Sequence, residues 1–284
     1  ILLSVPLLLS AGIVSETADT ISYQQSNGET VTVHKLPKRP VVLHISLTGM
    51  WYAAGGKAIA RPHAPRLHVL PEEARTLPEV GDFYNPNLEK LLALKPDLVL
   101  LHSKRRKHWE VQKLLRSAGV ESVCVDYTNY DDFLTLLDFF SRVNGNPPEA
   151  EAVRKKITSE VLCAETAKLK PVTFISMIVS GTGFLSETPR GNTANMAARL
   201  GGRNLVPAAS VVRVKYSMEQ LLMSDPDVIF LLCAGSNNKL SSRVRAILDK
   251  RPDWRNLKAV RNNRVYVLDA ESYLYLPGKR YPEA

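Results

Sequence analysis

The chain has 284 residues and a formal net charge of +9, and 45% of its residues are hydrophobic while 23% are charged. This length accommodates two domains of ordinary size, and the composition is that of a folded globular chain, which excludes a disordered or membrane-embedded protein. The positive charge is dispersed except for the run Lys104–Lys107, and no recognition-helix pattern, RNP motif or zinc finger accompanies it. We therefore expect no nucleic-acid partner.

The N-terminal residues differ from the rest of the chain. Residues 1–9 form an apolar run, which the small residues Ser10, Ala11 and Gly12 follow. The run is too short to span a bilayer and fits the end of a signal peptide with its cleavage zone. We expect residues 1–20 to comprise a signal-peptide remnant and the mature N-terminus, with secretion to the periplasm or the extracellular face. A buried N-terminal strand is the alternative. Ile13 stands where a lipoprotein carries its lipidated cysteine, so a lipid anchor is not supported.

The next segments predict an N-terminal α/β lobe over residues 21–147. Residues 21–43 read as a hairpin with Asn27-Gly28 at its turn, and residues 40–45 read as a strand that precedes a loop and a helix closing at Gly55-Gly56. Residues 131–143 are helical and end at Asn144-Gly145. After Pro147-Pro148 a second helix is expected over residues 149–170, about 33 Å long at 1.5 Å per residue. We interpret residues 148–170 as a linker helix.

Two segments of the chain repeat each other. Residues 87–101 align with residues 217–231, so that Glu89 matches Glu219 and each copy carries Pro-Asp before an apolar run. Asn87 and Ser217 are good N-caps, and each glutamate falls in a first turn, where the helix dipole favours negative charge. Each apolar run reads as a buried parallel strand. Upstream of the second copy, residues 171–175 predict a strand and residues 194–200 a helix closing at Gly201-Gly202. The pattern predicts two Rossmann-like α/β lobes with parallel sheets, the second over residues 171–284.

Three further segments carry a family resemblance. Residues 80–101 (VGDFYNPNLEKLLALKPDLVLL), 254–269 and 276–280 resemble the class III solute-binding proteins, helical-backbone receptors for ferric siderophores, haem, cobalamin and related metal complexes. The resemblance implies a monomeric, extracytoplasmic substrate-binding protein that works with the permease subunits and cytoplasmic ATPase of an ABC importer. It implies that Glu89 and Glu219 dock on permease arginines. Because family members usually carry another helix after this point, the end at Ala284 is expected to be a truncation.

The resemblance also implies that an iron complex is bound as cargo in the inter-lobe cleft, with no intrinsic cofactor. Cobalamin and an oxyanion such as molybdate are alternative ligands, and a ligand sensor is an alternative role. The chain contains no GxSxG, P-loop or HExxH motif, so we expect no enzyme. The cysteines Cys124, Cys163 and Cys233 lie far apart without a CxxC pair, which predicts buried free thiols.

The ligand of an open α/β lobe faces the carboxyl ends of the strands. The loops expected there are residues 44–51, 61–65, 81–85, 102–109 and 126–130 in the first lobe and 180–192, 233–238 and 270–280 in the second. Their aromatic side chains bury flat organic surface, and their cations pair with carboxylate or catecholate oxygens. The ligand-binding candidates are Trp51, Arg61, Tyr84, Lys104, Arg105, Arg190, Tyr273 and Arg280. An ordinary solvated role is the alternative for each.

The histidines limit the metal chemistry. All six precede residue 109, so imidazoles from both lobes cannot close a site for a free divalent metal. A haem requires an axial tyrosine or histidine. The candidates for that role are Tyr84, His63, His102 and Tyr273.

Overall fold

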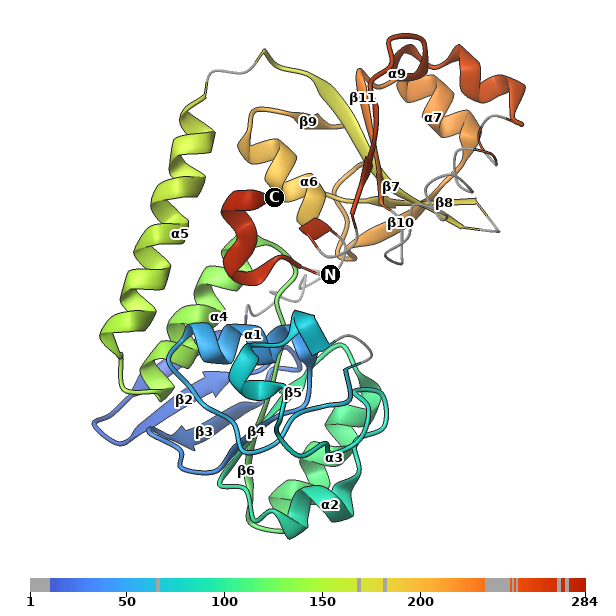
Figure 1. The fold of residues 1–284 in the computed structure, drawn as a ribbon. Helices are drawn as coiled ribbons and strands as arrows, with labels where there is room; N and C mark the ends of the chain where they lie inside the picture. The colour runs from blue at the N-terminus through green and yellow to red at the C-terminus, as the bar shows by residue number, and fades with distance from the viewer. Residues whose placement is uncertain are drawn as a thin grey trace, which may run out of the picture. The chain divides into compact units, whose positions relative to one another are not determined.

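The computed structural model describes residues 11–64, 67–167, 170–180, 183–232, 246, 248, 250–269, 272–273 and 276–284. The chain divides into two compact units (Figure 1). Unit 1 comprises the residues up to Tyr127 and Asp132–Lys155, and unit 2 comprises Thr128–Asp131 and Lys156–Ala284. In the ranges given above, no helix is long and apolar enough to cross a membrane. The apolar run at residues 1–9 lies outside the described residues.

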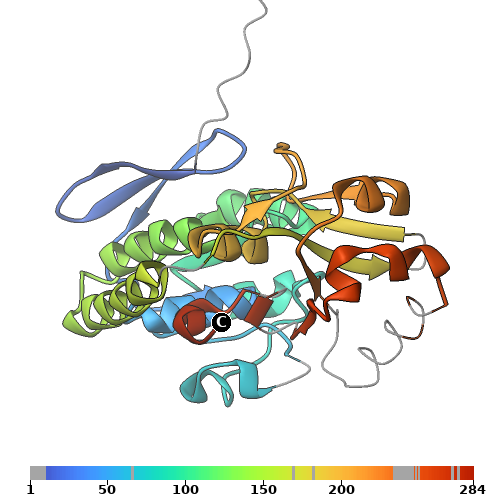
Figure 2. The same ribbon diagram turned by 90° about the horizontal axis from the view of Figure 1, so that it is seen from above.

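Unit 1 begins with an antiparallel sheet in the order β1-β2-β3, formed by β1 (Gly12–Glu16), β2 (Thr20–Gln24) and β3 (Thr30–His34). Gly28 has a φ of 86°, which a glycine adopts without strain, and its N–H donates to the carbonyl of Gln25 at 2.9 Å. The hairpin predicted around Asn27-Gly28 is therefore confirmed. This sheet, in blue in Figure 2, is not hydrogen-bonded to the parallel sheet that follows.

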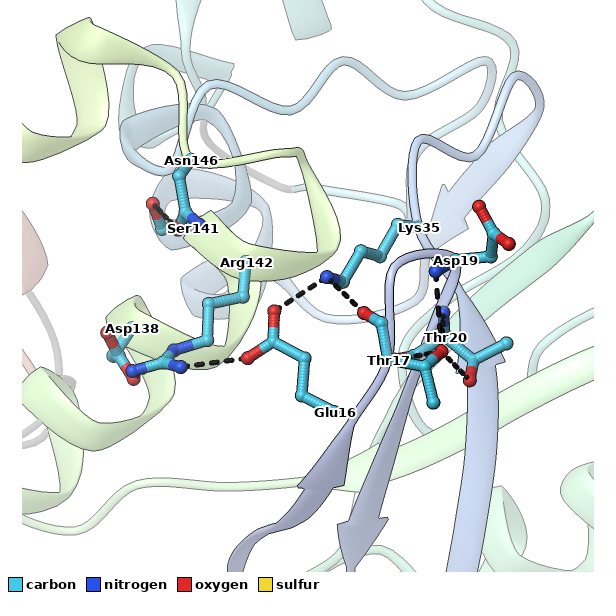
Figure 3. Close-up of polar contacts among 9 residues, drawn as sticks. All are labelled: Glu16, Thr17, Asp19, Thr20, Lys35, Asp138, Ser141, Arg142 and Asn146. Carbon is cyan, nitrogen blue, oxygen red and sulfur yellow. Dashed lines mark hydrogen bonds and ion pairs between the residues drawn. The ribbon is translucent and has the colours of Figure 1, made fainter.

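One carboxylate ties β1 to the rest of unit 1. Glu16 accepts hydrogen bonds from Lys35 Nζ at 2.6 Å and from Arg142 at 2.8 Å, and Arg142 also binds Asp138 at 2.8 Å (Figure 3). The hydrogen bonds from Lys35 and then Arg142 lower the pKa of Glu16. Because Arg142 belongs to α4 (Tyr130–Val143), the end of β1 is anchored to that helix.

The second sheet of unit 1 is parallel, as predicted, with the order β4-β5-β6. Its strands are β4 (Pro40–Val42), β5 (Leu98–His102) and β6 (Glu121–Val125), and its helices include α1 (Ile45–Ala53), α2 (Leu88–Ala93) and α3 (Arg106–Ser117). Two short 3-10 helices, η1 (Leu67–Val69) and η2 (Glu72–Ala74), lie between α1 and α2. Every residue of β5 is buried, which is typical of a central strand in a parallel sheet.

The segment after β4 corrects two predictions. The strand ends at Val42 and α1 begins at Ile45, so most of the loop expected at residues 44–51 is helical. Helical spacing turns Trp51 into the core, where it is fully buried. Its ring forms a T-shaped contact with that of Phe140, with the ring centroids 5.3 Å apart. A Cβ atom at Gly56 would lie 2.3 Å from the indole. The prediction that Trp51 contacts a ligand is wrong.

Unit 2 holds a mixed sheet in the order β10-β8-β7-β11-β12, with β9 beside β7. Its strands are β7 (Thr173–Ser180), β8 (Gly183–Glu187), β9 (Arg203–Asn204), β10 (Arg213–Tyr216), β11 (Val228–Leu232) and β12 (Val265–Leu268). Parallel pairing joins β7, β11 and β12, as predicted. However, β8 and β10 run antiparallel, so residues 183–187 form a strand where a loop was expected. On β8, the ring of Phe184 is buried in the core.

Among the described helices of unit 2, α6 (Asn192–Arg199), α7 (Met218–Ser224), η3 (Pro252–Asn256) and α9 (Lys258–Arg261) accompany this sheet. The 3-10 helix η5 (Gly278–Glu283) contacts α6, where the hydroxyl of Tyr281 lies 2.8 Å from Oδ1 of Asn192. The core between helices and sheet contains Ile175, Met177, Leu221, Ile229, Leu231, Trp254 and Leu257.

The long helix α5 spans Pro148–Thr166, shorter than the range 149–170 predicted for it. The division between the two units falls inside this helix. Of its apolar stripe, Ala150 and Ile157 are buried, whereas Ala164 is exposed. Cys163 is also exposed, so its predicted burial is wrong. The prediction for Cys124 is confirmed, and Cys233 lies outside the described residues.

Candidate functional site

Three histidines gather at the carboxyl edge of the parallel sheet of unit 1. His44 follows β4, His102 ends β5 and His108 lies in α3. The rings of His44 and His102 are tilted by 52° with their centroids 4.1 Å apart. His108 Nδ1 accepts the backbone N–H of His102 at 2.8 Å, and His108 Nε2 lies 2.7 Å from the carbonyl oxygen of Phe83. The fold thus places side chains from three elements at one edge.

All three imidazoles are held in the neutral form. Burial, followed by the effect of the nearby Lys104, lowers the pKa of His102 to about 3. Burial also lowers the pKa of His44, followed by the effect of the neighbouring His102, and burial lowers the pKa of His108. Burial removes the water that would solvate a charged imidazole, so the neutral form is favoured. The cluster therefore presents neutral polar groups at pH 7.

A cationic platform lies beside these rings. The rings of Phe83 and Tyr84 stack at 4.0 Å, and the guanidinium of Arg105 lies 5.1 Å and 4.8 Å from their respective centroids. The Nε atom of Arg105 is buried without a hydrogen-bond partner. In the part of the chain that the structure describes, no carboxylate pairs with this guanidinium. Arg105 is therefore an uncompensated charge held on two aromatic faces.

The other predicted cations of unit 1 are neutralised. Lys104 pairs with Asp126 at 3.0 Å, and Arg61 pairs with Glu79 at 3.0 Å. The same Glu79 carboxylate lies 3.0 Å from Nδ1 of His63, which leaves the other ring nitrogen of this haem-ligand candidate as the atom that could bind iron. Because a carboxylate already compensates each of them, Lys104, Arg61 and His63 are poorer anion-binding groups than Arg105.

The candidates of unit 2 lie around the N-terminus of α6. Arg190 and Arg280 are exposed, and neither forms an ion pair among the described residues. Tyr273 is half-buried, its hydroxyl donates to the carbonyl of Ala284, and its own carbonyl accepts a hydrogen bond from Asn192 at 3.2 Å. Burial raises the pKa of Tyr273. The candidate loop 233–238 and parts of 180–192 and 270–280 lie outside the described residues.

A cavity of about 500 Å³ lies elsewhere in unit 1. It is lined by Ala18, Asp19, His34, Lys35, Leu36, Arg142, Gly145 and Asn146. Its cations Lys35 and Arg142 both bind Glu16, as Figure 3 shows, and no predicted ligand-binding residue lines it. These two cations are therefore already compensated, and we consider the edge with Arg105 the stronger anion site.

Comparison with known proteins now decides the family. The family model described as periplasmic binding protein matches residues 41–272. The chain belongs to the periplasmic binding protein family. This finding confirms the predicted resemblance and the α/β fold.

Two relatives of this periplasmic binding protein have names that refer to iron compounds. It is 25% identical over 277 residues to the Fe(3+)-citrate-binding protein YfmC of Bacillus subtilis (strain 168), covering 95% of this chain and 84% of that protein. It is 26% identical over 207 residues to the high-affinity heme uptake system protein IsdE of Staphylococcus aureus (strain MRSA252), covering 70% of this chain and 69% of that one.

Solved structures show the same fold. An ABC transporter substrate-binding protein from Listeria monocytogenes EGD-e has a TM-score of 0.75 at 21% identity, with 86% of this chain and 95% of that chain covered. The periplasmic vitamin B12 binding protein BtuF of Vibrio cholerae has a TM-score of 0.68 at 23% identity, with 87% and 93% covered. At these identities the likeness concerns the fold alone.

The repeated glutamates of this periplasmic binding protein occupy equivalent helix starts. Glu89 and Glu219 are exposed in the first turns of α2 and α7, and neither has a partner among the described residues. The side chain of Asn87 caps α2 by accepting the N–H of Lys90 at 2.9 Å. Ser217 forms a reciprocal capping box in α7. Because these N-caps satisfy end groups of each helix, both carboxylates remain free for an external cation.

Sequence reasoning missed part of the site. His44 and His108 were not among the candidates, although His44 directly follows a strand, where ligand-facing residues are expected. His108 was hidden by its place inside a helix, four residues after Lys104 along a basic stretch. No group of three or more His, Cys, Asp or Glu among the described residues could hold a metal ion.

Proposed function

We propose that this periplasmic binding protein is the extracytoplasmic substrate-binding protein of an ABC importer and that its cargo is an anionic iron complex. The family match supports a receptor rather than an enzyme. The names of YfmC and IsdE connect relatives with Fe(3+)-citrate and heme uptake. The observation that carries the proposal is the uncompensated Arg105 on the Phe83–Tyr84 pair.

Arg105 is arranged to receive an anion with little loss of entropy. A guanidinium stacked on aromatic faces is held in orientation, while its N–H edge stays available for two parallel hydrogen bonds to a carboxylate or a similar oxygen pair. The neutral histidines beside it add polar groups without adding charge. In unit 2, the unpaired Arg190 and Arg280 are the corresponding candidates for cargo contacts.

Replacement of Arg105 tests the cargo site. We expect Arg105→Ala to weaken binding of ferric citrate about tenfold, which corresponds to roughly 1.4 kcal/mol, the order expected for losing a hydrogen bond to a charged group. Arg106→Ala is the matched control, because that neighbouring side chain is 96% exposed. Isothermal titration calorimetry with ferric citrate, haem, cobalamin and molybdate measures the effect. Equal affinities of the Arg105→Ala and Arg106→Ala variants would remove the basis of the proposal.

The permease contact forms the second half of the proposal. We infer that Glu89 and Glu219 dock on cationic residues of the two transmembrane subunits, since each is exposed, unpartnered and placed at an equivalent helix start. The double variant Glu89→Ala/Glu219→Ala is expected to keep its cargo affinity and to lose uptake in cells. Glu72→Ala/Glu160→Ala removes the same charge from exposed positions of both units and serves as the control. Similar uptake by the two double variants would refute the docking role.

A further inference from the structure

The protonation pattern of two histidines can be read from their backbone partners. A backbone N–H can only donate a hydrogen bond, so a ring nitrogen that it reaches must carry a lone pair. The N–H of Lys104 reaches Nδ1 of His102 at 3.2 Å, and the N–H of His102 reaches Nδ1 of His108 at 2.8 Å. In the neutral form, both rings therefore carry their proton on Nε2.

These two Nε2–H groups differ in what they meet. His108 donates its Nε2–H to the carbonyl of Phe83 at 2.7 Å, so all its polar atoms are used inside unit 1. Nε2 of His102 has no hydrogen-bond partner among the described residues. His102 is nevertheless buried, with 7% of the residue exposed. His102 thus offers a directed, unused N–H donor at the edge where Arg105 lies.

We propose that the Nε2–H of His102 donates a hydrogen bond to an oxygen atom of the cargo, an inference that rests on the proposed function. The cargo is then a ferric chelate whose own carboxylate or hydroxamate oxygens complete the coordination of the iron. Such a chelate presents acceptor oxygens at its periphery. Arg105 supplies the charge that binds them, and His102 adds a neutral donor that fixes their position.

The hydrogen bond from the N–H of Lys104 to Nδ1 disfavours metal ligation by His102. A metal would need the lone pair of Nε2, which requires the proton to move to Nδ1. A proton on Nδ1 would point at the N–H of Lys104, so two donors would face each other in a part-buried place, which is unfavourable. Histidines that bind metals usually donate their second ring nitrogen to an acceptor, whereas His102 accepts at that atom. The candidate role of His102 as an axial haem ligand is therefore replaced by a donor role.

His44 is the member of the cluster whose proton position is not set in this way. Its Nδ1 lies 2.8 Å from the hydroxyl of Ser46, which can donate or accept. The inference consequently concerns His102, and His44 serves as an internal comparison in the first experiment.

Long-range ¹H–¹⁵N NMR of the histidine rings tests the proton position on His102 in the full chain without any ligand. At pH 7 the spectrum should show the Nε2–H tautomer for His102, assigned by the loss of its signals in His102→Gln. An Nδ1–H tautomer or an imidazolium at His102 would overturn the inference. This readout is independent of the cargo.

Binding measurements test the cargo class, with ferric citrate and haem as probes. His102→Gln retains an acceptor for Lys104 and an N–H donor, so we expect its ferric citrate affinity to stay within about threefold of the wild type. His102→Phe keeps the ring volume without a donor and should lose about tenfold. Haem should show no Soret shift that depends on His102.

The outcomes separate the two proposals. A haem complex with a Soret band that His102→Gln abolishes would overturn the donor role while the importer function stood. A wild-type protein that binds neither probe, nor cobalamin, would refute the proposed function itself. If His102→Phe fails to fold, the tautomer measurement still tests the inference, because an Nδ1–H tautomer at His102 would leave no proton on Nε2 to donate to the cargo.

Discussion

Acid is expected to destabilise unit 1 through His102. The ordinary histidine pKa of 6.5 applies to the unfolded chain, and the pKa in the folded state is about 3. Between these values the unfolded state binds a proton that the folded state does not, so stability falls as the pH drops below about 6.5. From pH 7 to pH 5, His102 alone accounts for a loss of about 2 kcal/mol, from about 1.4 kcal/mol per pKa unit.

The groups around His102 explain why its protonation would destabilise the folded state. A proton on His102 would face Lys104, Arg105, His44 and His108, and it would lose the hydrogen bond from the N–H of Lys104. The pKa values of His44 and His108 are also lowered, so the wild-type protein should lose more than the contribution of His102. The difference between the wild type and His102→Gln isolates that contribution, because glutamine does not titrate.

Urea unfolding at pH 7 and pH 5 measures the effect in a Trp254→Phe background. The chain has three tryptophans, of which Trp51 and Trp109 belong to unit 1 and Trp254 to unit 2, so fluorescence then reports unit 1. We expect the free energy of unfolding of the His102→Gln protein to fall about 2 kcal/mol less than that of the wild type. An identical decrease in both proteins would show that folding does not lower the pKa of His102, and the reasoning would fail.

Three further results are expected from the fold. Gly56→Ala should cost about 3 kcal/mol, because the new Cβ would overlap a buried indole, whereas Gly49→Ala in α1 should stabilise by about 0.5 kcal/mol; thermal unfolding compares them, and equal Tm values would contradict the packing. With the third cysteine replaced by serine, Ellman's reagent should label Cys163 rapidly and Cys124 only after unfolding, since burial raises the pKa of the Cys124 thiol. Glu16→Gln should reduce stability by about 1 kcal/mol, a loss that 1 M salt should diminish if the ion pairs carry it.

Local pattern was sufficient for several of the regular elements and for the family. The Asn27-Gly28 turn, the N-caps Asn87 and Ser217 and the apolar runs that became β5 and β11 depend on neighbours within a few residues. Such short-range preferences are written directly in the order of the residues. Strand β8 escaped prediction because its stability depends on pairing with β7 and β10 rather than on its own pattern.

The function of individual side chains depended on the tertiary structure. Lys104 and Arg105 are adjacent in the chain, yet Asp126 neutralises one and two aromatic rings hold the other free. Trp51 is equally unremarkable in sequence and fully buried in the core. Charge compensation and burial are set by groups that lie far apart along the chain and meet only on folding, so no local pattern distinguishes a free cation from a paired one.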